Sequence, residues 1–145
     1  MIEEHTALHV LKGAVEQILG ERVTTSASAR NGKGRLSIEI SRKPTEKDIQ
    51  DIEKKANRKV QDDVPIECFE IHRTEAERLY GKRIYDRFPV PEKIKILKIV
   101  SIPDWNLNCC AHEHAKTTGE VGKIEITKHR YRASRGELEI SFELS

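Results

Sequence analysis

Asn31-Gly32-Lys33-Gly34-Arg35-Leu36-Ser37-Ile38-Glu39-Ile40-Ser41 is the stretch of sequence that decides the fold. Its second part alternates apolar and polar residues, which is typical of a strand with one buried face. The Asn-Gly pair favours the positive φ angles that a tight hairpin turn requires. We therefore expect a partner strand over residues 23–29, and the stretch predicts an antiparallel pair of strands.

A helix is predicted before this hairpin, over residues 3–19. Its apolar residues recur at helical spacing, and Gly20 follows as a stop signal. The apolar positions are Leu8, Leu11, Val15, Ile18 and Leu19. His5, His9 and Glu16 lie off this stripe, so they are free to face a cleft while the stripe packs on the core.

Two helices and four strands are predicted after the hairpin. Thr45 caps the first helix with Asp48 near the required spacing, and Thr74 with Glu77 forms a capping box for a short helix that ends at Gly81. The strands are expected over residues 66–72, 94–102, 122–127 and 137–144. Because the strands run in groups, we expect one α+β domain over residues 1–145, with helices packed on a mixed, largely antiparallel sheet.

Composition agrees with one soluble, cytoplasmic domain. The chain has 145 residues, no apolar run near the length of a membrane span, and no signal-peptide pattern at its start. Its three cysteines make an odd set, which indicates a reducing compartment and thiols that serve as ligands. Cys68 lies in an apolar segment and is expected in the core.

Two pairs of potential metal ligands are each spaced four residues apart. His5 and His9 form the first pair, and Cys110 and His114 form the second. Residues at this spacing share one face of a helix, so each pair can present two ligands to one ion, and together they predict a four-ligand zinc site. The first pair alone is equally compatible with a polar helix edge, and Cys109 is an alternative to Cys110. Thr6 follows the first histidine, where a metalloprotease motif would have Glu, so a peptidase of that type is not expected.

Basic residues gather in two stretches although the net charge is only +2. Residues 116–135 hold six basic and two acidic residues, and residues 30–43 hold five basic and one acidic. Such runs are usually a solvated surface. Beside a metal site they also suit a partner that carries phosphates.

The ordered motifs of the chain resemble the small AlaX proteins, the free-standing relatives of the editing domain of alanyl-tRNA synthetase. The resemblance covers nearly the whole chain. It rests on the two ligand pairs, on Asp104 to Asn108, on the run Thr117-Thr118-Gly119-Glu120-Val121-Gly122, on the turn Phe88-Pro89-Val90-Pro91 and on the closing strand from Glu137.

The resemblance implies a zinc-dependent hydrolase that deacylates alanine tRNA carrying serine, with glycine as a further candidate. It assigns zinc to His5, His9, Cys110 and His114. Its candidates for binding the substrate are Thr24, Thr25 and Ser26 for the serine hydroxyl, and Lys116 and Gly119 near the tRNA end. Further basic residues expected to contact tRNA phosphates are Lys12, Lys123, Arg130 and Arg132.

Three alternatives stay open. The synthetase motif reads C-G-G-T-H, whereas Ala111-His112-Glu113 intervene here, which makes His112 an alternative ligand. The substrate could instead be serine on threonine tRNA, because threonyl-tRNA synthetase editing domains use the same ligand pairs. A closed four-ligand zinc ion is usually structural, which would suit a non-catalytic RNA-binding module. No side chain is assigned as general base, and the oligomeric state is undetermined.

Overall fold

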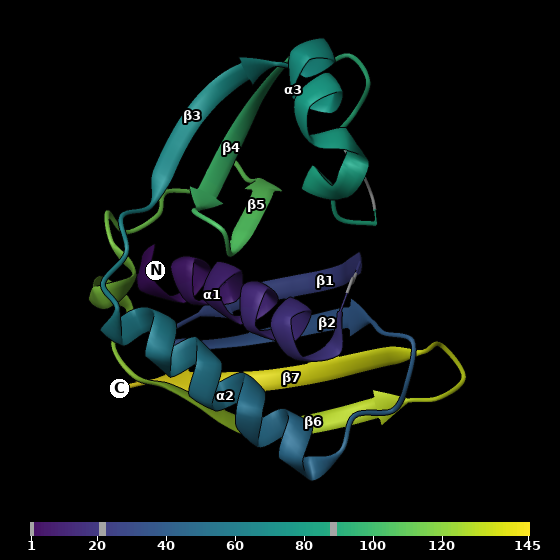
Figure 1. Cartoon of the computed structure of the whole chain (residues 1–145), viewed down its shortest axis with the longest axis vertical. Helices are drawn as coiled ribbons and strands as arrows, with labels where there is room; N and C mark the ends of the chain where they lie inside the picture. Colours follow the sequence, from purple (N-terminus) through teal and green to yellow (C-terminus); the bar gives the residue numbers. More distant parts are fainter. Residues whose placement is uncertain (1, 21–22, 88–89) are drawn as a thin grey trace.

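The computed structural model describes residues 2–20, 23–87 and 90–145, and it confirms an α+β fold (Figure 1). The strands form two sheets rather than the one expected. A four-stranded sheet has the order β1-β2-β7-β6, and a three-stranded sheet has the order β3-β4-β5. Every strand pair described is antiparallel. Phe88 and Pro89 of the turn noted above lie outside the described residues.

The predicted hairpin forms the start of the larger sheet. Strand β1 (Val23–Arg30) and strand β2 (Lys33–Glu39) are joined at Asn31 and Gly32, which have φ angles of 53° and 75°. Two consecutive positive φ angles match the turn type that follows the natural twist of a hairpin. The pairing register shifts between Thr24 and Ser26, so β1 carries a bulge there.

The last two strands complete this sheet from the far end of the sequence. Strand β6 (Ile124–Arg132) pairs with β7 (Glu137–Leu144), and β7 pairs with β2 so that Leu36 lies opposite Ile140. Gly34 leaves room for the ring of Phe142, which a Cβ at that position would strike. The sheet therefore depends on pairing across about a hundred residues of sequence.

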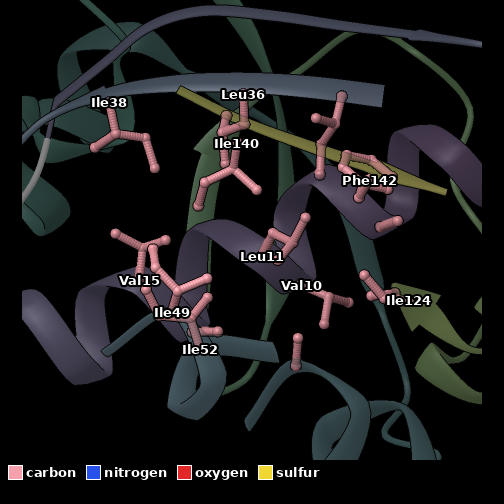
Figure 2. Packing of buried hydrophobic residues seen from close by; sticks show 14 of the residues in the cluster. Val10, Leu11, Val15, Leu36, Ile38, Ile49, Ile52, Ile124, Ile140 and Phe142 are labelled. Carbon is pink, nitrogen blue, oxygen red and sulfur yellow. The ribbon is translucent and has the colours of Figure 1, made fainter. Parts of the chain in front are cut away.

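Two helices cover one face of the larger sheet (Figure 1). Helix α1 (Ile2–Leu19) and helix α2 (Glu46–Gln61) pack against each other and bury their apolar sides on the strands. Figure 2 shows this core, in which side chains of the helices meet those of β2 and β7. Thr45 caps α2 in a capping box with Asp48, as predicted.

The smaller sheet holds three strands, namely β3 (Glu67–His72), β4 (Ile96–Ile102) and β5 (Asn106–Cys109). Its own core is small. Ala76 of helix α3 (Arg73–Tyr80) and Ile84 of the short helix η1 (Gly81–Ile84) form it with Leu97 and Ile99 of β4. Strand β5 was not predicted. Its four residues follow a three-residue turn after β4, and four residues are too short a pattern to stand out in the sequence.

Two other expectations were wrong. Helix α3 begins after His72 without a side-chain cap, because the Glu77 carboxylate accepts hydrogen bonds from Arg73 and Tyr85 instead of from the helix start. Cys68 is exposed rather than buried, although all three cysteines are free as expected. In the described part of the chain, no helix is long and apolar enough to cross a membrane.

Candidate metal centre

The polar face of α1 meets β5 at the seam between the two sheets. His9 and Lys12 lie one turn apart on α1, while Asn106 and Asn108 alternate along β5 and so point to the same side of that strand. His9 Nδ1 lies 2.9 Å from Asn106 Oδ1, and Lys12 Nζ donates to Asn108 Oδ1 over 2.8 Å. All four residues are buried, so these two polar pairs fix the helix to the strand.

Three of the four predicted metal ligands come together at this seam. The ligand atoms of His9, Cys110 and His114 all lie within 4.8 Å of one another, and this cluster could hold a metal ion. The second pair reaches the cluster in a way that the sequence did not predict. Residues 110–114 form no helix, so Cys110 and His114 converge through an irregular loop that follows β5.

Hydrogen bonds hold this loop at both ends. The amide of Cys110 donates to the carbonyl of Lys98 on β4 over 3.0 Å. The amide of Ala115 donates to Thr6 Oγ1 on α1 over 2.9 Å, and the same hydroxyl donates to the carbonyl of Ile2. The position of the loop is therefore fixed by the smaller sheet on one side and by α1 on the other.

His9 is held in the form that binds a metal. Because Asn106 Oδ1 is an acceptor, His9 donates from Nδ1 and keeps Nε2 as the unprotonated nitrogen. Burial is the main cause that lowers the pKa of His9 well below its ordinary value, and the charge of Lys12 adds to it. The ring is thus neutral, as metal binding requires.

His114 gives the strongest indication that a partner belongs here. Both of its ring nitrogens are buried, and neither has a hydrogen-bond partner among the described residues. Burial, followed by the charges of His5 and His112, lowers the pKa of His114 to about 4. Two unpaired buried nitrogens are costly, and a metal bond to one of them would relieve part of that cost.

The donor set suits zinc. One thiol and two imidazoles are typical zinc ligands, and two of them come from a loop while the third comes from a helix. Burial raises the pKa of the Cys110 thiol above its ordinary value. A bound cation would reverse that effect, because a coordinating thiol is deprotonated.

His5 and His112 form a separate pair beside the cluster. Their ring centroids lie 3.9 Å apart with an interplanar angle of 37°. His112 Nδ1 also lies 3.6 Å from Cys110 Sγ. The fourth expected ligand, His5, thus packs against a residue of the loop and is not part of the three-residue cluster.

The three hydroxyl residues proposed for serine recognition lie on different faces of the larger sheet. Thr24 pairs with Ile38 and is buried on the face that α1 covers, and its Oγ1 has no hydrogen-bond partner within the described chain. Thr25 Oγ1 lies 3.3 Å from the Ser37 carbonyl oxygen and from Glu137 Oε1. Thr25 and Ser26 line a shallow hollow on the outer face, away from α1.

The run after His114 has a structural role. Helix η2 (Thr118–Val121) begins with a capping box between Thr117 and Glu120. Thr118 Oγ1 donates to the carbonyl of Lys59 in α2 and accepts a hydrogen bond from the amide of Val64 in the α2–β3 connection. The amide of Gly119 donates to Asp63, whose side chain leaves no room for a Cβ at that position. A glycine is therefore required at position 119 because Asp63 packs directly against its Cα.

The predicted basic residues separate into two groups. Lys116, Lys123 and Arg130 are exposed. Lys12 is buried against Asn108 and lies 3.4 Å from Asp86, so the expectation that it contacts tRNA phosphates is wrong. Lys12 lies on the polar side of α1, and this side packs on β5 instead of facing solvent.

A hollow of about 1080 Å³ lies beside the seam and does not include the cluster. It is lined by Trp105, Asn106, Tyr80 and Arg135, among others. Asn106 and Asn108 were missed as functional residues in the sequence. Their alternation with Leu107 and Cys109 was the available signal, because it places both amides on one side of a strand.

No family model matches the chain. It is similar to alanine–tRNA ligases of archaea: 36% identical over 127 residues to that of Metallosphaera sedula, 35% over 129 residues to that of Methanococcus aeolicus, and 37% over 127 residues to that of Hyperthermus butylicus. These matches cover 87% to 88% of this chain and 14% of each ligase. The chain is therefore similar to one segment of those ligases and spans 14% of their length, which confirms the resemblance found in its motifs.

Proposed function

We propose that the protein is a zinc-dependent editing domain that removes serine from mischarged alanine tRNA. The observation that carries the proposal is the cluster of His9, Cys110 and His114 in a homologue of alanine–tRNA ligases. A synthetase pocket for a small side chain discriminates weakly against similar amino acids, so a separate hydrolysis step is the usual remedy. Glycine on the same tRNA is a second candidate substrate.

The residues of the chain suit ester hydrolysis at this cluster. Zinc held there would supply a Lewis acid for the ester carbonyl and lower the pKa of an attacking water. Asn106 orients the His9 ring, and Thr6 holds the end of the loop that carries His114. These supporting contacts keep the ligands in place, which outer-sphere residues do in other metal sites.

Thr24 is the candidate that best suits recognition of serine. Its hydroxyl is buried on the face of the sheet that α1 covers, and its unpaired Oγ1 can bond to the serine side chain. Alanine has no hydroxyl and would leave this oxygen unpaired, which disfavours the correctly charged tRNA. Thr25 and Ser26 lie toward the outer face, so we do not assign them this role.

The exposed basic residues would hold the tRNA by its phosphates. Lys116 lies two residues beyond His114, Lys123 lies just before β6, and Arg130 lies on β6. Contacts with phosphates contribute affinity for tRNA that falls as the salt concentration rises, and they do not depend on the nucleotide sequence. Mischarged tRNA as substrate also implies that the protein works in the cytoplasm.

The experiment measures the release of labelled amino acid from seryl-tRNA(Ala), seryl-tRNA(Thr) and alanyl-tRNA(Ala) by the zinc-loaded and the chelator-treated protein. We expect fast loss of serine from alanine tRNA alone, and only with zinc. Thr24→Val should lower the rate on seryl-tRNA(Ala) by about tenfold or more, since one lost hydrogen bond to a buried group is worth about 1.5 kcal/mol. Ser26→Ala is the matched control and should change nothing.

Other outcomes would redirect the proposal. Loss of serine only from threonine tRNA would assign the second substrate. No hydrolysis of any ester, together with unfolding on removal of zinc, would favour a non-catalytic RNA-binding module with a structural metal.

A further inference from the structure

The carboxylate of Asp86 lies at the seam and takes no part in the function described so far. We propose that Asp86 binds the free α-amino group of the amino acid in the ester substrate, so that the site accepts aminoacyl esters and rejects esters whose amine is blocked. This inference rests on the proposed function and deepens it, because it adds a point of recognition to the metal cluster and Thr24.

The first step is the link between Asp86 and the strand that carries Thr24. The amide of Arg87 donates to the carbonyl of Thr24 over 2.9 Å, which places the preceding residue, Asp86, beside the start of β1. The hydroxyl of Thr24 is buried and has no hydrogen-bond partner within the described chain. Asp86 is therefore attached next to the residue proposed to bind the serine hydroxyl.

The second step is the link between Asp86 and the elements that carry the cluster. Asp86 Oδ1 accepts hydrogen bonds from Lys12 Nζ over 3.4 Å and from Asn108 Nδ2 over 3.3 Å. Lys12 follows His9 by one turn of α1. Asn108 precedes Cys110 by two residues. Both donors thus adjoin metal ligands, and Asp86 lies between the cluster and the start of β1.

The third step is the state of the carboxylate. Both bonds go to Oδ1, and Oδ2 has no hydrogen bond or ion pair within the described part of the chain. The side chain of Asp86 is 39% exposed, whereas that of Lys12 is 4% exposed. The buried ammonium of Lys12 and the amide of Asn108 hold the carboxylate in one orientation. Its second oxygen is left open to a ligand.

The fourth step is chemical. An aminoacyl ester carries an α-amino group on the same carbon atom as its side chain, and this amine is largely protonated near neutral pH. A carboxylate binds an ammonium group through a charge-assisted hydrogen bond, which is stronger than a neutral one. An ester with an acylated amine, such as a peptidyl ester, lacks this charge and would leave Asp86 Oδ2 unpaired. It is disfavoured for the same reason as an alanyl ester at Thr24.

The test measures the binding of two non-hydrolysable amides of adenosine to the zinc-loaded full chain. One amide carries serine, and the other carries hydroxypropanoate, which lacks only the α-amino group. We expect the seryl amide to bind about 10- to 100-fold more tightly, the range for a hydrogen bond to a charged group. Asp86→Asn should remove this preference and leave the dissociation constant of the hydroxypropanoyl amide unchanged. Isothermal titration calorimetry provides the four dissociation constants.

Glu143→Gln is the matched control, because Glu143 is also a carboxylate paired with a lysine, at 3.3 Å from Lys33 Nζ on the surface of the larger sheet. It should keep the full preference for the seryl amide. Far-UV circular dichroism checks that each variant folds. If Asp86→Asn does not fold, Lys12→Met is combined with it, since the double variant removes both charges of the pair and should also lose the preference.

A preference for the seryl amide that persists without the Asp86 carboxylate would overturn the inference, because the amine would then be bound elsewhere in the site. Equal binding of the two amides by the unchanged protein would also overturn it, as would no binding of either.

Hydrolysis separates this inference from the function. The unchanged protein should hydrolyse N-acetylseryl-tRNA(Ala) at least about tenfold more slowly than seryl-tRNA(Ala), and Asp86→Asn should slow only the second reaction. Equal rates of serine release from seryl-tRNA(Ala) by the unchanged protein and by Asp86→Asn would refute the inference and leave the function standing. A preference for the seryl amide that depends on Asp86, in a protein that hydrolyses no ester, would do the reverse.

Discussion

The two sheets of this protein differ most in how much apolar surface they bury. The larger sheet, with α1 and α2, encloses a continuous cluster that includes Leu11, Leu36, Ile140 and Phe142 (Figure 2). The smaller sheet and α3 enclose four buried hydrophobic residues among those the structure describes. Burial of apolar area is the main source of stability, so the larger sheet should hold the fold together.

The metal cluster joins the two regions. His9 comes from a helix that belongs to the larger core, while Cys110 and His114 follow a strand of the smaller sheet. The comparison of the two regions shows that His9 is held in place by the packing of α1 in the larger core. The positions of Cys110 and His114 depend instead on the hydrogen bonds that hold the loop over residues 110–115.

The largest effect should come from a truncation in the larger core. Phe142→Ala removes a ring that is 1% exposed and should lower the free energy of unfolding by about 3–5 kcal/mol. Leu97→Ala, in the smaller core, should lower it by about 2–3 kcal/mol, at the low end for such a change, because its neighbourhood is small and can relax. Urea denaturation of both variants measures the two values.

Amide hydrogen exchange sharpens the same comparison. Leu97→Ala should speed exchange in β3, β4 and β5 while β6 and β7 stay protected, since stability is not uniform across a structure. Equal acceleration in both sheets would show that they unfold as one unit.

A smaller effect is expected where α1 passes the turn before β5. The Trp105 indole donates to the carbonyl of Val10 over 2.9 Å and lies against Gly13, which leaves no room for a Cβ. Gly13→Ala should therefore destabilise the protein by about 1–3 kcal/mol through overpacking. In a Trp105→Ala background the same change should stabilise it by up to about 1 kcal/mol, because alanine favours a helix.

Thermal or urea unfolding of the four proteins in this cycle provides the measurement. A Gly13→Ala effect that is the same with and without the indole would mean that Trp105 does not fix α1 to the smaller sheet.

The smallest effect concerns the start of α2, which is distant from the smaller sheet (Figure 1). Arg42, followed by the amide of Thr45, lowers the pKa of Asp48 to about 2 from an ordinary value of 3.8. The contribution of this carboxylate to stability is thus fully present above pH 3.8 and lost as the pH falls through about 2. Asp48→Ala should cost about 0.5–1 kcal/mol at pH 7 and almost nothing near pH 2.

Comparison of urea midpoints for Asp48→Ala and the unchanged protein at several pH values tests this sign. A cost that persists undiminished at pH 2 would show that the helix cap does not depend on the charged carboxylate.

Elements with strong local patterns could be predicted from the sequence. The Asn31-Gly32 hairpin, the apolar stripe of α1 and the Thr45 cap of α2 each follow from residues close together in the chain. The division of the strands into two sheets could not be predicted, because it depends on which distant strands pair. Strand β5 was missed because only four residues form it.

The site was predicted in part for a similar reason. The spacing of His9, Cys110 and His114 was informative, but residues 110–114 form an irregular loop, whereas the four-residue spacing had been explained by a shared helix face. Spacing in sequence shows which residues are available and not which conformation brings them together. The buried state of Lys12 and the bond from His9 to Asn106 required knowledge of where β5 packs.

Hydrogen bonds attach the loop between Cys110 and Ala115 to β4 at one end and to α1 at the other, and its three central residues, 111–113, are exposed, with His112 packed on His5. The side chains at its centre can therefore be replaced by substitution. New side chains can be introduced at its centre without repacking either core, which makes this short segment a convenient place to change the surroundings of the candidate metal site and leave the fold unchanged.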